Sequence, residues 1–118
     1  HALAYKLSFD SGQLAESPVS TALGDGMACR TPVAEALDVI WKDVARVVTV
    51  SDAELAEAIR LYFTTTHNLA EGSGAAALAG ALKEEQAPDR PVGLVLSGGN
   101  IDRALYARVL AGEDFAAA

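Results

Sequence analysis

A short, continuously apolar run near the C-terminus is the feature that most constrains the fold. Residues 92–96, Val-Gly-Leu-Val-Leu, lie between Pro91 and the turn sequence Ser-Gly-Gly-Asn at 97–100. A run of this length is typical of a strand that is buried on both faces, as in a parallel sheet covered by helices. The chain is therefore predicted to place helices against a largely parallel sheet.

Two earlier segments continue the alternation of helix and strand. Thr31 and Pro32 have the order of a helix N-cap followed by proline at the first helical position, which predicts a helix over 32–44. Residues 47–50 form a short run rich in β-branched side chains and predict a second strand. The sequence therefore predicts a helix followed by a strand in this part of the chain, as expected for a sheet that is covered by helices.

Three more helices are predicted. Residues 51–54 have the Ser-x-x-Glu spacing of a capping box, which predicts a helix that stops near His67. The alanine-rich segment 75–82 predicts a helix whose small side chains allow close packing against a sheet. A last helix is expected over 101–111, with Gly112 as its C-cap.

This alternation favours an α/β fold, a partial three-layer sandwich with a mostly parallel sheet. Two strands are too few for such a sheet, so we expect it to be completed by residues outside this chain or by a second molecule. We interpret residues 1–118 as a single fragment of one domain. It comprises an irregular N-terminal segment at 1–30, alternating helices and strands at 31–112, and a tail at 113–118.

The composition excludes several classes of function. The formal net charge is -7, and the nine Lys and Arg residues are scattered among sixteen acids, which disfavours nucleic-acid binding. The longest apolar run is too short to span a bilayer, so no membrane partner is expected. Cys29 is the only cysteine, which agrees with a reducing, cytoplasmic location.

The turn at 97–100 is the first candidate for chemistry. In open α/β sheets, ligands bind outside the carboxyl ends of the strands, where this turn is expected. Its two glycines would let the backbone approach a ligand closely. An ordinary strand-to-helix turn, with Ser97 as the helix N-cap, remains an alternative interpretation.

Four ordered blocks resemble one family. Ser-Gly-Gly-Asn-Ile-Asp at 97–102 is similar to the C-terminal signature of the dehydratase, serine racemase and threonine deaminase group of pyridoxal phosphate enzymes, which have fold type II. Segments 23–28, 47–54 and 71–75 resemble further blocks of that group in the same order. The resemblance covers 3–112 and implies a fragment of the large, cofactor-binding domain.

The resemblance implies a lyase that removes the hydroxyl of serine, threonine or another β-substituted amino acid, giving a 2-oxo acid and ammonia. It implies that the Ser97 hydroxyl bonds the pyridine nitrogen of pyridoxal phosphate, and that Gly98, Gly26 and Glu71 line the cofactor. Capping or solvent exposure for Glu71, and turn formation for Gly26, stay open as alternatives. Asn100 matches a residue that contributes to a nucleotide effector site in some members, and we expect it to cap backbone here.

The resemblance also implies what lies outside this chain. The family's Schiff-base lysine, its glycine-rich phosphate loop and its principal metal ligands all precede the matched region, so no catalytic or metal residue is predicted here. We therefore expect the isolated chain to be inactive and not to bind the cofactor. Its expected partners are the missing N-terminal part, an amino-acid substrate and further copies in a homo-oligomer. A stand-alone metabolite-binding domain and a natural split subunit are the alternatives.

Overall fold

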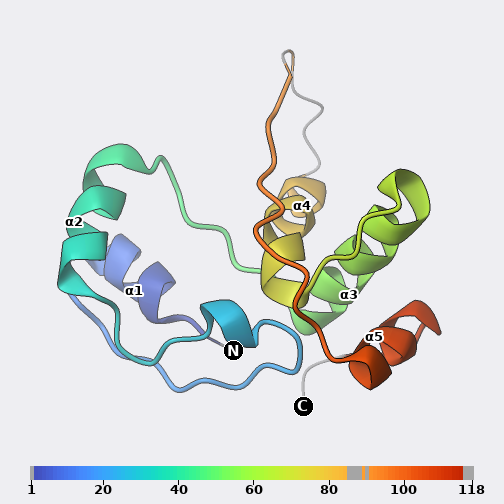
Figure 1. Ribbon diagram of the computed structural model, residues 1–118. Coiled ribbons are helices and arrows are strands. Elements are labelled where there is room, and N and C mark those ends of the chain that lie inside the picture. The colour runs from blue at the N-terminus through green and yellow to red at the C-terminus, as the bar shows by residue number, and fades with distance from the viewer. Residues whose placement is uncertain (1, 85–88, 90, 116–118) are drawn as a thin grey trace. The chain divides into compact units, whose positions relative to one another are not determined.

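Helices are the regular elements of the residues that the structure describes. The computed structural model describes residues 2–84, 89 and 91–115. One compact unit takes in the chain up to Thr21 together with Met27–Thr49, and a second takes in Ala22–Gly26 together with the chain from Val50 onward. No helix among the described residues is long and apolar enough to cross a membrane. In chain order (Figure 1) the elements are α1 Ala4–Ser11, the 3-10 helix η1 Asp25–Met27, α2 Ala34–Asp43, α3 Asp52–Leu61, the π-helix η2 Tyr62–Thr66, α4 Gly72–Lys83 and α5 Arg103–Leu110.

The predicted sheet is not found within the described residues. Their one β-type pairing is an isolated antiparallel bridge between Ala2 and Val19. The two predicted strands, 47–50 and 92–96, have no regular secondary structure, and Val95 is 74% exposed. A strand needs a neighbour to pair its backbone N–H and C=O groups, and these residues supply none for either segment.

The N-terminal segment, which was predicted to be irregular, contains the helix α1. Its buried residues are small, Ala4 and Ser8, one helical turn apart. The Ser8 carbonyl accepts a hydrogen bond from the Trp41 indole N–H of α2 at 3.1 Å. Because the buried face of α1 carries no large apolar side chain, the helical period is weak in the sequence.

Helix α2 begins later than predicted. It spans Ala34–Asp43, with Val33 at the N-cap and no side-chain cap. Thr31 therefore does not cap this helix, and its hydroxyl instead donates a hydrogen bond to Glu16 Oε1 at 3.0 Å. The exposed Glu16 carboxylate is a charged acceptor, which strengthens the hydrogen bond that the threonine hydroxyl donates.

Helix α3 has the predicted capping box. The Ser51 hydroxyl accepts a hydrogen bond from the Glu54 N–H at 3.2 Å, and the Ser51 N–H donates to Glu54 Oε2 at 2.6 Å. Glu54 also forms an ion pair with Lys83 at the end of α4, with an N–O distance of 3.1 Å. The start of α3 is thus tied both to its own first turn and to α4.

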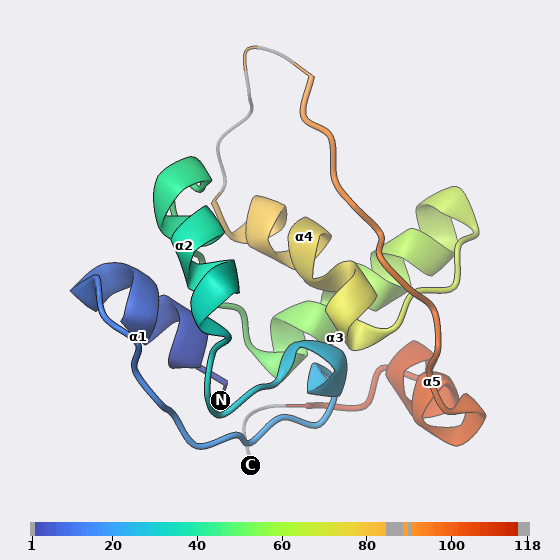
Figure 2. The ribbon, with the colours of Figure 1, turned by 60° about the vertical axis from the view of Figure 1, so that its left-hand side comes forward.

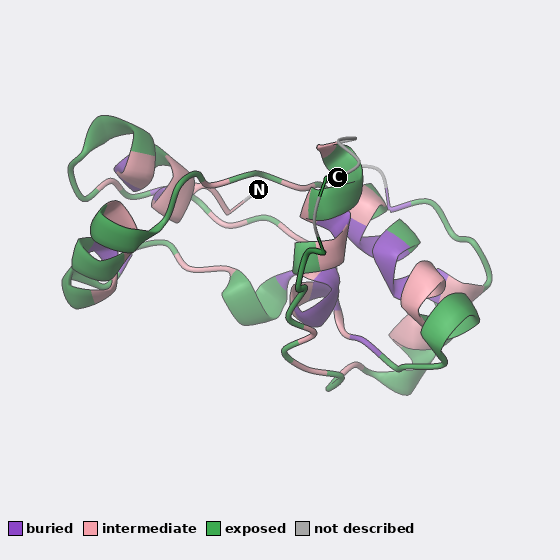
Figure 3. Cartoon of the chain, turned by 90° about the horizontal axis from the view of Figure 1, so that it is seen from above, coloured by how far each residue is buried: buried purple, intermediate pink, exposed green. Residues whose placement is uncertain are grey.

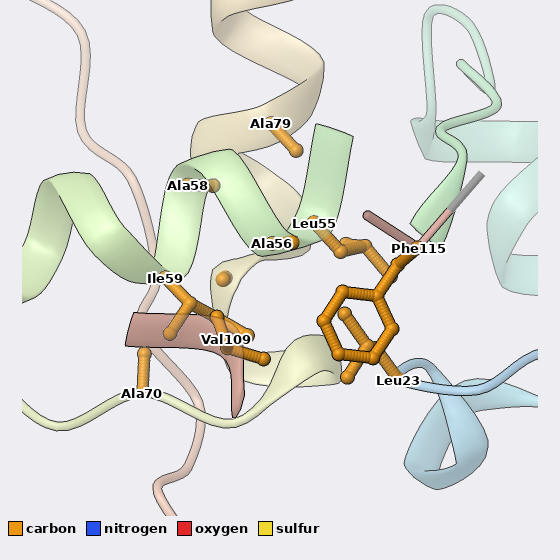
Figure 4. Packing of buried hydrophobic residues seen from close by; sticks show 10 residues of the cluster. Leu23, Leu55, Ala56, Ala58, Ile59, Ala70, Ala79, Val109 and Phe115 are labelled. Carbon is orange, nitrogen blue, oxygen red and sulfur yellow. The ribbon is translucent and has the colours of Figure 1, made fainter. Parts of the chain in front are cut away.

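The hydrophobic core of the second unit lies between α3 and α4, which lie side by side in Figures 1 and 2. Helix α4 contributes Ala75 and Ala79, whose small side chains let the helix approach closely. The sequence predicted such packing against a sheet, whereas α3 takes that place here. The buried members of the cluster (Figures 3 and 4) are Leu23, Leu55, Ala56, Ala58, Ile59, Ala70, Ala75, Ala79, Val109 and Phe115.

The ends of the remaining helices follow the sequence signals closely. The π-helix after α3 ends at Thr66, and its C-cap His67 takes a left-handed φ of 56°, close to the predicted stop. Helix α5 starts two residues later than expected, because Asp102 is its N-cap. Gly112 follows its C-terminus with a left-handed φ of 83°, as a glycine after a helix commonly does.

The ring of Tyr106 in α5 packs edge-on against the ring of Phe63 in the π-helix, and burial raises the pKa of the Tyr106 hydroxyl.

Replacing Glu54 by glutamine should destabilise the chain at neutral pH and much less in acid. The hydrogen bond from the Ser51 backbone N–H, helped by Lys83, lowers the pKa of Glu54 below its ordinary value of 4.5. The charged form is therefore favoured by folding. Its contribution is complete above the unfolded pKa and is lost as the pH falls through the folded one.

We expect a loss of about 0.5–1 kcal/mol at pH 7 from urea unfolding curves, and a smaller loss at pH 3. Glu57→Gln, at an exposed position of the same helix, is the matched control and should change little at either pH. An equal loss for Glu54→Gln at both pH values would contradict this account.

Candidate functional site

Three stretches that are distant in the sequence meet at the first turn of α4. They are residues 23–26, 71–74 and 98–99, all within the second unit. An added Cβ that would fall within about 3 Å of another atom marks a close approach between segments, and a side chain is excluded where that atom belongs to the backbone.

The first stretch lies directly against the helix start. A Cβ added to Gly72 would fall 2.0 Å from the Leu23 carbonyl oxygen, and one added to Gly26 would fall 2.8 Å from Ser73 Oγ. Only glycine fits at 72, because the obstacle there is backbone. The Leu23 N–H also donates to Asp52 Oδ1 of α3 at 3.2 Å. The stretch is therefore attached to both helices of the core.

The third stretch contacts the same turn through Gly98. The Glu71 N–H donates a hydrogen bond to the Gly98 carbonyl at 3.1 Å. A Cβ added to Gly74 would fall 2.1 Å from that carbonyl oxygen, and one added to Gly98 would fall 2.2 Å from Glu71 Oε1. Two of the predicted site residues, Glu71 and Gly98, are thus in direct contact although they lie far apart in the sequence.

Ser97 directly precedes this contact and is exposed. Its alternative role as a helix N-cap is wrong, because Asp102 Oδ1 accepts two backbone N–H groups at the start of α5, at 2.8 and 3.0 Å. The same observation corrects the capping role expected for Asn100. The helix begins only at Arg103, which places both side chains outside its first turn.

The four predicted residues are linked to this turn in different ways. Glu71 is the N-cap residue of α4 but makes no side-chain cap, and its carboxylate lies against Gly98 instead. Gly26 reaches the turn through Ser73, and Ser97 adjoins it through Gly98. The simple capping role held open for Glu71 is therefore not the one its side chain plays.

Ser73 was missed by sequence reasoning. Its Oγ atom exposes less than 1 Å² and has no hydrogen-bond partner in the part of the chain that the structure describes. A serine between two glycines carries no sequence signal beyond that of a turn, since its environment depends on residues 23–26 folding back onto it.

Other polar features lie outside this turn. His67 Nδ1 is 3.2 Å from the Phe63 carbonyl oxygen, which supports a structural role at the helix end. Within the described ranges, no group of three or more His, Cys, Asp or Glu residues could hold a metal ion. A hollow of about 360 Å³ in the first unit is lined by Glu16, Ser17, Pro18, Val19 and Arg30.

The sequence and the fold both match known proteins. A family model described as "Pyridoxal-phosphate dependent enzyme" matches residues 2–98. The L-threonine ammonia-lyase of Thermotoga maritima is 33% identical over 75% of this chain, and the L-threo-3-hydroxyaspartate ammonia-lyase of Saccharomyces cerevisiae is 30% identical over 91% of it. The crystal structure of the threonine deaminase of T.th. matches 86% of the chain with a TM-score of 0.78 and 32% identity.

The chain spans only part of each of these proteins. It covers 22% of the Thermotoga protein, 33% of the yeast protein and 37% of the threonine deaminase chain. The solved structure agrees with the fold type that the sequence blocks indicated, although no sheet is formed within the described residues.

Two glycines of α4 should respond in opposite ways to substitution by alanine. Gly74→Ala places a methyl group against the Gly98 backbone, whereas Gly80 has nothing within 4 Å of an added Cβ. We expect Gly74→Ala to destabilise the chain by about 1–3 kcal/mol. Gly80→Ala, the matched control, should stabilise it by about 0.4–1 kcal/mol because alanine restricts the unfolded chain. Thermal unfolding measures both, and equal effects would contradict the close contact at Gly74.

Proposed function

The chain belongs to the family of pyridoxal-phosphate dependent enzymes, and on that premise we propose that it is the C-terminal portion of a threonine or serine dehydratase. The complete enzyme would remove the hydroxyl of a hydroxy amino acid by β-elimination, with a 2-oxo acid and ammonia as products. The relatives named as ammonia-lyases support this reaction class. The contact between Glu71 and Gly98, directly beside Ser97, is the observation that carries the assignment of the site.

The residues present fit a flat, aromatic cofactor. Gly98 and Gly26 present backbone without side chains, so a planar ring could lie close to either. The Ser97 side chain is exposed, and Asp102 has taken over the capping of α5, which leaves the Ser97 hydroxyl available to a ligand. When bound, pyridoxal phosphate supplies an electron sink for bond cleavage at the substrate Cα.

We assign Ser97 the task of holding a proton toward the ring nitrogen. A hydroxyl is neutral, so its hydrogen bond to the nitrogen leaves that nitrogen largely unprotonated, whereas a carboxylate in its place would favour the protonated form. A largely unprotonated ring nitrogen makes the ring a weaker electron sink, and this suits elimination of a β-hydroxyl group.

Glu71 has the task of shaping this part of the pocket. Its backbone N–H binds the Gly98 carbonyl at 3.1 Å, which orders the turn that carries Ser97. Its carboxylate lies over Gly98, where a side chain at position 98 would displace it. Any substitution that moves Glu71 would therefore also move the backbone that aims the Ser97 hydroxyl.

The remainder of the enzyme completes the sheet in this proposal. Residues 92–96 carry three large apolar side chains that are exposed here, Val92 at 59%, Leu94 at 40% and Val95 at 74%. Exposed apolar side chains on an unpaired segment favour a neighbouring strand from another part of the enzyme. That part would also contribute the Schiff-base lysine and the phosphate loop.

The isolated chain should not catalyse the reaction. Purified chain incubated with pyridoxal phosphate and threonine or serine is expected to give no 2-oxo acid above the rate of the cofactor alone. Adding the preceding part of the enzyme as a separate chain should restore turnover. Turnover by this chain alone would overturn the proposal and favour a complete catalyst within these residues.

Ser97 variants of the assembled enzyme test the site itself. Ser97→Ala should weaken pyridoxal phosphate binding about three- to tenfold, the usual worth of one neutral hydrogen bond. Ser97→Thr keeps the hydroxyl and should bind nearly normally. Ser97→Asp should alter the absorbance spectrum of the bound cofactor and its pH dependence, because the ring nitrogen would be protonated. An unchanged spectrum and affinity in all three variants would exclude contact between Ser97 and the ring.

A further inference from the structure

The hydroxyl of Ser73 in the first turn of α4 is the strongest unexplained feature of the molecule. Its Oγ atom is buried and has no partner within the described residues. Ser8, on α1, behaves differently: its hydroxyl donates to the Ala4 carbonyl at 2.8 Å and accepts from the Ala15 N–H at 2.8 Å. A buried hydroxyl is normally satisfied in this way, since an unpaired one is costly.

Ser73 lies where the segments of the candidate site converge. A Cβ added to Gly26 would fall 2.8 Å from Ser73 Oγ, so the hydroxyl faces that stretch of backbone. Its sequence neighbour Gly74 is packed against the Gly98 carbonyl, and Glu71, two positions earlier, contacts Gly98 as well. The hydroxyl with no partner among the described residues therefore faces Gly26, one of the residues proposed to line the cofactor, and lies in the same helical turn as the residues that contact Gly98.

Nothing in the local helix requires a serine at this position. Alanine has the higher helix propensity and would leave no polar atom unpaired, so it should be the more stable residue. Residues that reduce the stability of the fold in this way are typical of ligand sites, where the missing partner arrives with the ligand.

We propose that Ser73 is a ligand-binding residue whose hydroxyl forms its hydrogen bond with an acceptor oxygen of the bound cofactor or of the amino-acid substrate. The inference rests on the proposed function and extends it to a residue in α4. In the complete enzyme Ser73 would act together with Gly26, one supplying the polar contact and the other the space beside it.

The first experiment uses the chain by itself. Ser73→Ala should raise the melting temperature, because it removes an unsatisfied hydroxyl and adds a better helix former. Ser8→Ala is the matched control and should lower the melting temperature, because it removes two hydrogen bonds. A fall for Ser73→Ala comparable to that of Ser8→Ala would mean that the hydroxyl already has a partner, and would overturn the proposal.

The second experiment uses the enzyme assembled with its preceding part. Ser73→Ala should weaken the binding of pyridoxal phosphate, titrated by absorbance, about three- to tenfold if the acceptor belongs to the cofactor. If the acceptor belongs to the substrate, cofactor affinity should stay normal and the affinity for serine, read from the spectral change on its addition, should fall by a similar factor.

Two negative results have different meanings. If the wild-type enzyme binds the cofactor and Ser73→Ala binds both cofactor and serine equally well, the role of Ser73 is excluded while the proposed function stands. If the wild-type enzyme binds no pyridoxal phosphate at all, the proposed function fails and the inference fails with it.

Discussion

Backbone-to-backbone contact at the first turn of α4 is the constraint on which the second unit depends. Gly72 lies against the Leu23 carbonyl and Gly74 against the Gly98 carbonyl, at separations that leave no room for a Cβ. Carbonyl groups from two remote parts of the chain therefore reach one helix end. Because the contacts are made by backbone, they define the positions of the neighbouring side chains more narrowly than contacts between flexible side chains would.

The core helices α3 and α4 hold the segments that make this contact. Helices α3 and α4 pack through alanines, and Asp52 at the start of α3 accepts hydrogen bonds from the N–H groups of Ala22 and Leu23 at 2.8 and 3.2 Å. The stretch that reaches Ser73 is thus attached to the same two helices that form the core. A site built on packed helices keeps its geometry better than one built on loops alone.

Stability and binding make different demands on this turn. The capping box of α3 and the glycines of α4 satisfy local and packing requirements, whereas the buried hydroxyl of Ser73 has no hydrogen-bond partner in the part of the chain that the structure describes. Three apolar side chains of 92–96, those of Val92, Leu94 and Val95, are exposed. Both features are explained together if the chain is completed by another part of the enzyme and by its ligand.

The sequence by itself determined the family and several helix ends, but not the two predicted strands, which are not formed within the described residues. Caps such as Ser51–Glu54 and the stop at His67 involve residues a few positions apart, so their physics is contained in a short window. Helix α1 was missed because its buried face carries Ala4 and Ser8 rather than large apolar residues. Only the tertiary structure decided that Glu71 contacts Gly98, that α4 packs on α3 and that the Ser73 hydroxyl is buried without a partner among the described residues. These three features depend on contacts between segments that are distant in the sequence, and local patterns of side chains do not predict such contacts.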